Sequence, residues 1–229
     1  MNDNVNERDS MELSGLLPSE YEEHIFQEVI TSPKPDCHNG DFHPYYWSCE
    51  IRSLRLAKRF LQFGLDPNGK NFDGSTALTW APNYEFTHFF LNAGAKVCNE
   101  KDGPFLSLHR AAEVGRVDQL RLLLMKGDGA NFLESQDEFG NTPLSVASRF
   151  GNLDCVSFLL DKGASVNNYG EVADYSSLQY ALSEGYEEIA RLLLNKGADP
   201  TDFPPLSESP ISLAKSQMLS SSIIKSLTG

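Results

Sequence analysis

Cysteine and histidine side chains gather near the start of the chain, where they could bind a metal. The segment CHNGDFHPYYWSC contains Cys37, His38, His43 and Cys49, and thiolates and imidazoles are common zinc ligands. Cys37 and His38 are adjacent, however, and the spacing matches no common zinc-binding pattern. We therefore favour a divergent helix with aromatic core residues, and keep a zinc-dependent activity at residues 37–49 as the alternative.

The rest of the chain offers little catalytic chemistry. Cys155 lies in a leucine-rich segment, at a position where a buried structural side chain is more common than a nucleophile. The sequence contains no glycine-rich phosphate-binding loop, no paired catalytic carboxylates and no activated serine motif. We predict that the chain is not an enzyme, has no catalytic residues and needs no cofactor.

The segment NTPLSVASRFGNLDCVSFLLDKGASVN, residues 141–167, predicts two short helices. Thr142 can cap the first helix, and Pro143 suits its first position because that position needs no N–H donor. Gly151 and Gly163 then end the two apolar segments. Each helix has only about two turns and is too short to be stable alone. The unit therefore needs neighbours of the same kind.

The same unit recurs along the chain. An apolar triplet precedes each of Gly94, Gly127, Gly163 and Gly197, which are 33, 36 and 34 residues apart. A leucine or isoleucine followed three residues later by alanine repeats with them: Leu78/Ala81, Leu108/Ala111, Leu144/Ala147, Leu178/Ala181 and Ile211/Ala214. A period near 33 with two short helices per unit predicts a stacked repeat array.

The motifs inside these units are similar to those of the ankyrin repeat family. They are Asp137, Gly140, Thr142-Pro143-Leu144, Gly151, Gly163-Ala164-Ser165-Val166-Asn167, Leu108-His109-Arg110-Ala111-Ala112 and Gly197-Ala198-Asp199. The resemblance covers about residues 50–228. It implies an all-α solenoid of helix-turn-helix repeats joined by finger loops, with partners bound on the concave face formed by fingers and first helices. It also implies that His109 ties neighbouring loops by hydrogen bonds.

We expect about five units with capping helices. Residues 1–36 would be a flexible N-terminus plus a capping helix, and residues 37–229 the ankyrin repeat domain. The units would be 37–68, 69–101, 102–136, 137–169 and 170–202, with a closing unit at 203–229. Two departures stand out: Pro82 should shorten the first helix of the second unit, and the finger at 128–141 is longer than its neighbours.

Charge restricts the partners. The chain has 32 acidic and 19 basic residues and a formal net charge of −13, which argues against nucleic-acid binding. No secretory signal or membrane-spanning run is recognisable. The four cysteines lie far apart in the array, so a disulfide framework is not expected. We predict a cytoplasmic protein with no nucleic-acid, membrane or small-molecule partner.

The predicted fingers concentrate the negative charge. Their 57 residues hold 13 of the 32 acidic side chains and 3 of the 19 basic ones, although turns also favour aspartate for local reasons. Aromatic residues lie among these acids. Candidate partner-binding residues are Phe72, Asp73, Trp80, Glu100, Asp102, Phe132, Glu134, Asp137, Glu138, Phe139, Arg149, Tyr169, Glu171, Asp174 and Tyr175.

Acids with interspersed rings favour a basic protein partner, steered by charge and anchored by aromatic contact. The predicted function is non-catalytic recognition of such a protein through an acidic, aromatic concave face. The role would be that of an inhibitor or a toxin-neutralising immunity protein. The alternative is a scaffold or adaptor in a regulatory complex.

Overall fold

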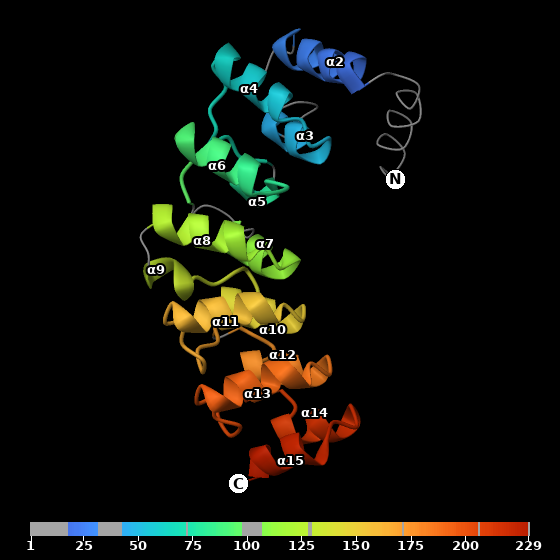
Figure 1. The fold of residues 1–229 in the computed structure, drawn as a ribbon, viewed down its shortest axis with the longest axis vertical. Coiled ribbons are helices and arrows are strands. Elements are labelled where there is room, and N and C mark those ends of the chain that lie inside the picture. Colours follow the sequence, from blue (N-terminus) through green and yellow to red (C-terminus); the bar gives the residue numbers. More distant parts are fainter. Residues whose placement is uncertain are drawn as a thin grey trace.

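The computed structural model describes residues 18–31, 43–71, 73–97, 107–127, 130–170, 172–205 and 207–228. Within these ranges the chain is nearly all helical, and its only bridge between extended residues joins Lys70 and Thr76. Short helices follow one another in pairs along the long axis, from α2 at one end to α15 at the other (Figure 1). The predicted all-α solenoid is confirmed.

The described helices are short, as the sequence pattern requires. Their bounds are α2 Pro18–Thr31, α3 Pro44–Glu50, α4 Leu54–Phe63, α5 Ala77–Trp80, α6 Tyr84–Asn92, α7 Ser107–Val114, α8 Val117–Lys126, α9 Ala130–Leu133, α10 Pro143–Arg149, α11 Leu153–Asp161, α12 Ser177–Ser183, α13 Glu187–Asn195, α14 Pro210–Ser216 and α15 Ser221–Thr228. We number the pairs by their first helices: α3, α5, α7, α10, α12 and α14 begin pairs 1 to 6.

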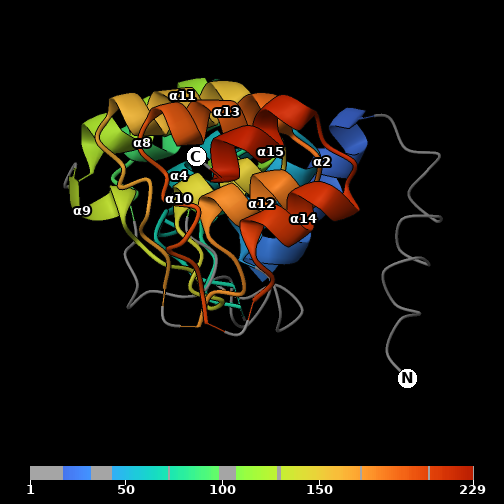
Figure 2. The same cartoon turned by 90° about the horizontal axis from the view of Figure 1, so that it is seen from below.

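The pairs stack in two layers. First helices pack on first helices, as in α7 on α10 and α10 on α12, while second helices pack on second helices, as in α8 on α11 and α11 on α13. Viewed along the stack, the second helices lie on one side and the connecting loops project on the other, with the first helices between them (Figure 2). The repeated leucines Leu108, Leu144 and Leu178 are all buried between the layers, so the core runs continuously through the stack.

Pair 4 shows why the sequence folds this way. The Thr142 side chain caps α10 by accepting a hydrogen bond from the Ser145 amide, and Pro143 occupies the first helical position. Gly151 turns the chain between α10 and α11 with φ of 75°, and Gly163 ends the pair with φ of 95°. Both conformations lie in the left-handed region, which glycine adopts without a steric penalty.

Pair 2 carries the predicted interruption. Helix α5 has only four residues and stops before Pro82. The carbonyl of Ala81 is instead bound from pair 3: Arg116 Nη1 donates to it at 2.8 Å, and Gln119 Nε2 at 3.1 Å. Gln119 is buried and also donates to the hydroxyl of Thr87. The third pair thus satisfies polar groups that the broken helix leaves open.

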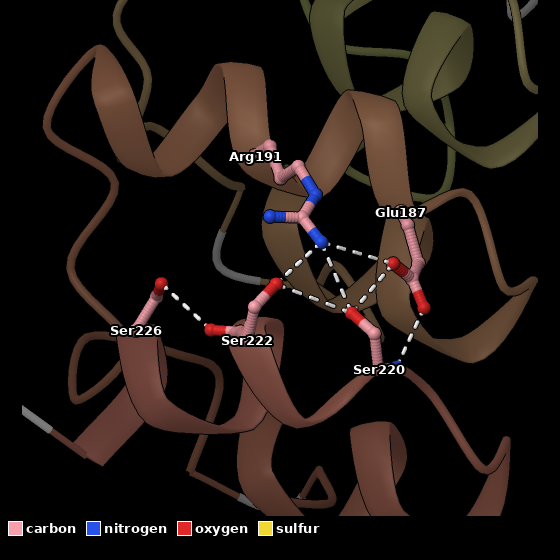
Figure 3. A network of polar contacts seen from close by, with 5 residues as sticks. All are labelled: Glu187, Arg191, Ser220, Ser222 and Ser226. Atoms are coloured by element: carbon pink, nitrogen blue, oxygen red, sulfur yellow. Dashed lines mark hydrogen bonds and ion pairs between the residues drawn. The ribbon is translucent and has the colours of Figure 1, made fainter.

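The two ends of the stack are covered. At the N-terminal end α2 packs on α4, with Ile25 and Val29 buried and an ion pair between Glu23 and Arg59 at 2.6 Å. At the C-terminal end, Glu187 of α13 accepts from the amide of Ser220 at 2.6 Å, just before α15. Arg191 completes that network by donating to the hydroxyls of Ser220 and Ser222 (Figure 3).

Candidate protein-binding face

One side of the stack combines the first helices with the projecting loops (Figure 2). We call this side the finger face. It comprises α3, α5, α7, α10, α12 and α14 with the described loop residues 66–71, 73–76, 134–142, 164–170, 172–176 and 199–205. Four of the predicted binding residues, Phe72, Glu100, Asp102 and Glu171, lie outside the described residues.

Two of the predicted acids hold their own turns. The Asp73 carboxylate accepts from the Ser75 amide at 2.8 Å and the Ser75 hydroxyl at 2.6 Å. The Asp137 carboxylate accepts from the amides of Phe139 at 2.9 Å and Asn141 at 2.8 Å. Such side-chain-to-backbone bonds are the local reason that aspartate is common in turns. Both carboxylates therefore have a structural role.

Glu134 connects one finger to the next. Its carboxylate accepts from the Ser165 amide at 2.7 Å and from the side-chain amide of Asn168. Asn68 and Asn167 make the corresponding bridges elsewhere, each to the backbone of the following finger. Glu134 thus bridges two fingers, as asparagine does at the other two positions, and its carboxylate already accepts hydrogen bonds from within the chain.

The position of Phe132 corrects the expectation that its ring faces a partner. The lengthened finger contains a short helix, α9, that the sequence analysis missed, and Phe132 is buried with 6% of its surface exposed. A methyl group placed on Gly127 would lie 2.7 Å from the ring, so the phenyl group fills the space beside that glycine. Phe132 belongs to the core because the extra residues fold back on the stack.

Other predicted residues remain accessible. Glu138, Arg149 and Asp174 are exposed, and Phe139 has 61% of its surface exposed. Tyr169 is half-buried and donates its hydroxyl to Asp202 at 2.8 Å.

Trp80 is also half-buried, on α5. Its ring nitrogen donates to Ser75, and the Arg110 guanidinium lies 5.4 Å from the ring centre.

A hollow of about 730 Å³ lies on the finger face between pairs 4, 5 and 6. We call it the finger hollow. It brings together three predicted residues, Arg149, Asp174 and Tyr175. It adds residues that the sequence analysis did not select: Val172, Ala173, Tyr180, Ser183, Glu184, Pro204, Pro205, Ser207 and Glu208. The repeat register could have identified Tyr180 as a residue of this face, because Tyr180 occupies the same first-helix position as Trp80 and Arg110.

The finger hollow has an aromatic wall and an excess of negative charge. The Tyr175 and Tyr180 ring centres are 5.5 Å apart and meet edge to face, and the Tyr180 hydroxyl donates to the Asn141 side chain at 2.9 Å. The Arg149 guanidinium lies 5.5 Å from the Tyr180 ring centre, a cation–π distance. Burial raises the pKa of Tyr180, so this phenol stays neutral at physiological pH.

Comparison with known proteins agrees with this architecture. A family model described as ankyrin repeats, three copies, matches residues 108–203. The crystal structure of the human ASB11 ankyrin repeat domain superposes with a TM-score of 0.67, at 25% identity and 82% coverage of both chains. Residues 108–203 are ankyrin repeats, and the stack as a whole has the ankyrin fold. The ankyrin fold is generally a non-catalytic module for protein–protein interaction.

Two relatives are similar to part of this chain. The chain is 40% identical over 92 residues to SMC5-SMC6 complex localization factor protein 1 of Bos taurus, covering 40% of this chain and 8% of that protein. It is 36% identical over 104 residues to the NF-kappa-B inhibitor cactus of Drosophila yakuba, covering 44% and 20%. The chain thus spans a minor part of these relatives' lengths.

In this ankyrin stack, His109 joins pairs 3 and 4. It is buried, and its Nε2 lies 2.9 Å from the carbonyl oxygen of Asn141. Burial lowers the pKa of His109, so the neutral imidazole donates its Nε2–H to that carbonyl. The expected hydrogen bond is present, and it ties helix α7 to the following finger.

The described zinc candidates of the first ankyrin pair have structural contacts. His43 caps α3 by accepting from the Tyr45 amide through Nδ1, and its own amide donates to Asn71 at 2.6 Å. Cys49 is buried, with Sγ 3.9 Å from the Ala77 carbonyl oxygen, and burial raises the pKa of its thiol. Cys37 and His38 lie outside the described residues. Across the described ranges, no three His, Cys, Asp or Glu side chains are grouped to hold a metal ion.

None of the helices in the described part of the chain is both long enough and apolar enough to span a bilayer.

Proposed function

We propose that the ankyrin stack recognises a basic protein through its finger face, without catalysis. The observation that carries this proposal is the finger hollow, where Asp174, Glu184 and Glu208 surround a pair of tyrosines and only one guanidinium opposes them. Carboxylates of this kind attract a basic surface, and rigid aromatic rings give it contact area.

The whole chain strengthens the attraction. With a net charge of −13, it accelerates encounter with a cationic partner and repels anionic ones. Because the helix pairs hold the finger face in one arrangement, little conformational entropy is lost on binding.

We propose an inhibitor as the biological role, which includes neutralisation of a toxin by an immunity protein. Its support is the resemblance to a relative named as an NF-kappa-B inhibitor. The second candidate is an adaptor within a regulatory complex, favoured by the relative named as a complex localization factor. We propose the cytoplasm as the compartment, since the described cysteines Cys49 and Cys155 are free, buried thiols.

The test is affinity capture of the tagged full chain from its native cells at low salt, with partners identified by mass spectrometry. A finger variant, Asp174→Asn/Glu184→Gln/Glu208→Gln, is compared with an outer variant, Asp118→Asn/Asp154→Asn/Glu188→Gln. The outer residues are exposed on second helices, so both variants lose three negative charges but on different faces.

One basic protein captured in equal amount, retained by the outer variant and lost from the finger variant, supports an inhibitor bound at the finger face. Several substoichiometric partners lost in the same way favour the adaptor. Equal capture by both variants contradicts binding at the finger face, and a partner that is not basic contradicts recognition by charge.

A further inference from the structure

We infer that the finger hollow receives an extended basic segment of the partner, and that Arg149 hydrogen-bonds the backbone of this segment. The inference rests on the proposed function and narrows it to one place and one kind of occupant. The hollow spans three helix pairs, with Arg149 on α10, Tyr180 and Ser183 on α12, and the loop residues Pro204 and Pro205 before α14.

The size of the hollow favours a chain segment. A space of about 730 Å³ lies in the range of pockets that bind small ligands, so a few side chains of a partner can enter it. It is lined by residues of α10 and α12 and by loop residues at 172–175, 204–205 and 207–208. A flat folded surface would leave most of this space unfilled, whereas an extended segment can enter between the loops and the helices.

The charges select basic side chains for this segment. Asp174 and Glu208 lie on two loops, and Glu184 follows the end of α12, so three separate segments of the lining each supply a carboxylate. The Tyr175 and Tyr180 rings form its wall. A lysine or arginine side chain lying along these rings would pair with the carboxylates and gain cation–π contact.

Arg149 is the exception within this acidic site, and its geometry suggests a reason. Its guanidinium lies 5.5 Å from the Tyr180 ring centre and 5.7 Å from that of Phe150. No side chain or carbonyl among the described residues accepts a hydrogen bond from it. The rings therefore orient the guanidinium, while its five N–H donors stay available for a ligand. Backbone carbonyls of an extended segment are acceptors of the right kind.

This role predicts the direction in which peptide affinity changes when Arg149 is neutralised. If the hollow attracted basic peptides by charge alone, neutralising Arg149 would make it more negative and strengthen binding. If Arg149 holds the backbone of the segment, Arg149→Gln weakens binding although a repulsive charge has been removed. The matched control is Arg121→Gln, because Arg121 also lies over a ring, 5.0 Å from the centre of Phe158, but on the second helix α8.

The experiment uses a phage-displayed library of random dodecapeptides, selected on the immobilised full chain. Recovered sequences are synthesised with capped ends. Their affinities are measured by calorimetry for the wild type, Arg149→Gln, Arg121→Gln, and the finger and outer variants defined above. Circular dichroism and melting temperatures establish that each variant is folded.

We expect recovered peptides rich in lysine and arginine. The finger variant and Arg149→Gln should each bind them about tenfold or more weakly, and both controls should bind within about twofold of the wild type. The inference is overturned if Arg149→Gln binds equally or more tightly, if the finger variant retains affinity, or if selection yields no basic binder. If the finger variant nevertheless loses the natural partner, the proposed function stands and a folded basic surface is the occupant.

Discussion

At the scale of single residues, acidic side chains with similar sequence settings have different roles. Glu134 and Glu138 lie four positions apart in the same lengthened finger. The Glu134 carboxylate accepts two hydrogen bonds from the following finger, whereas Glu138 is exposed. Glu134, Asp137 and Asp73 hold loops together, whereas Glu138, Asp174, Glu184 and Glu208 are exposed acids that a partner can reach.

The contrast between these two glutamates gives the first stability prediction. Glu134→Ala should lower the free energy of unfolding by about 0.5–1.5 kcal/mol, because the Ser165 amide and the Asn168 side chain lose their acceptor. Urea unfolding measures the change. Glu138→Ala is the matched control and should stay within about 0.5 kcal/mol of the wild type. Equal effects of the two substitutions would mean that the bridge contributes nothing to stability.

At the scale of elements, the short helices depend on contacts outside themselves. The network around α15 is an example: Glu187 of α13 accepts from both the amide and the hydroxyl of Ser220, while Arg191 reaches Ser220 and Ser222 (Figure 3). The last helix has eight residues and buries only Ile223 and Leu227 fully. Its attachment therefore relies on these polar contacts as well as on its apolar face.

This attachment should depend on pH. The hydrogen bonds from Ser220, with a further contribution from Arg191, lower the pKa of Glu187 below its ordinary value. A carboxyl with a lowered pKa in the folded state adds stability above its unfolded pKa and loses it as the pH falls through the folded pKa.

We therefore expect Glu187→Gln to melt below the wild type at about pH 7. The difference should shrink steadily from about pH 5 to pH 3. Thermal melts of both proteins across this range test the prediction. Glu188→Gln, an exposed neighbour in the same helix turn, controls for general charge effects. A difference between wild type and Glu187→Gln that stays constant with pH would contradict the assigned role.

The sequence predicted the elements better than the site. Repeated leucines, capping residues and glycines such as Gly151 specify local structure, and each acts within a few residues, so the helix pairs follow from the period. The bridge made by Glu134 and the burial of Phe132 depend on how the longer finger folds back as α9, and no local pattern encodes that path. The finger hollow also joins residues from three pairs, and only the repeat register relates them.

At the scale of the whole molecule, the core runs along the stack and each pair contacts mainly its neighbours. Stability is then a sum of pair stabilities and interface contributions. A defect in a middle pair weakens two interfaces, whereas a defect in the last pair weakens one. The finger hollow spans pairs 4 to 6, so its shape depends on the interfaces on both sides of pair 5.

This architecture predicts different consequences for equivalent core substitutions. Leu144 lies in pair 4 and Leu213 in pair 6, and both are buried. Leu144→Ala should cost about 2–5 kcal/mol and broaden or split the unfolding transition, because it uncouples the halves of the stack. Leu213→Ala should loosen the C-terminal end and leave the main transition nearly unchanged. Urea unfolding followed by circular dichroism, with hydrogen exchange of α14 and α15, distinguishes these outcomes. A single sharp transition in both variants would contradict a modular stack.

The broken helix of pair 2 has a consequence for how this array can evolve. Arg116 and Gln119 of pair 3 bind the carbonyl that Pro82 leaves open at Ala81. Pair 4 makes a related bridge, because Asn152 donates to the carbonyls of Ala112 and Glu113 in pair 3. A module that replaced pair 3 would therefore need a side-chain donor that reaches the Ala81 carbonyl. Without such a donor, the new neighbour would leave a backbone acceptor of pair 2 without a partner.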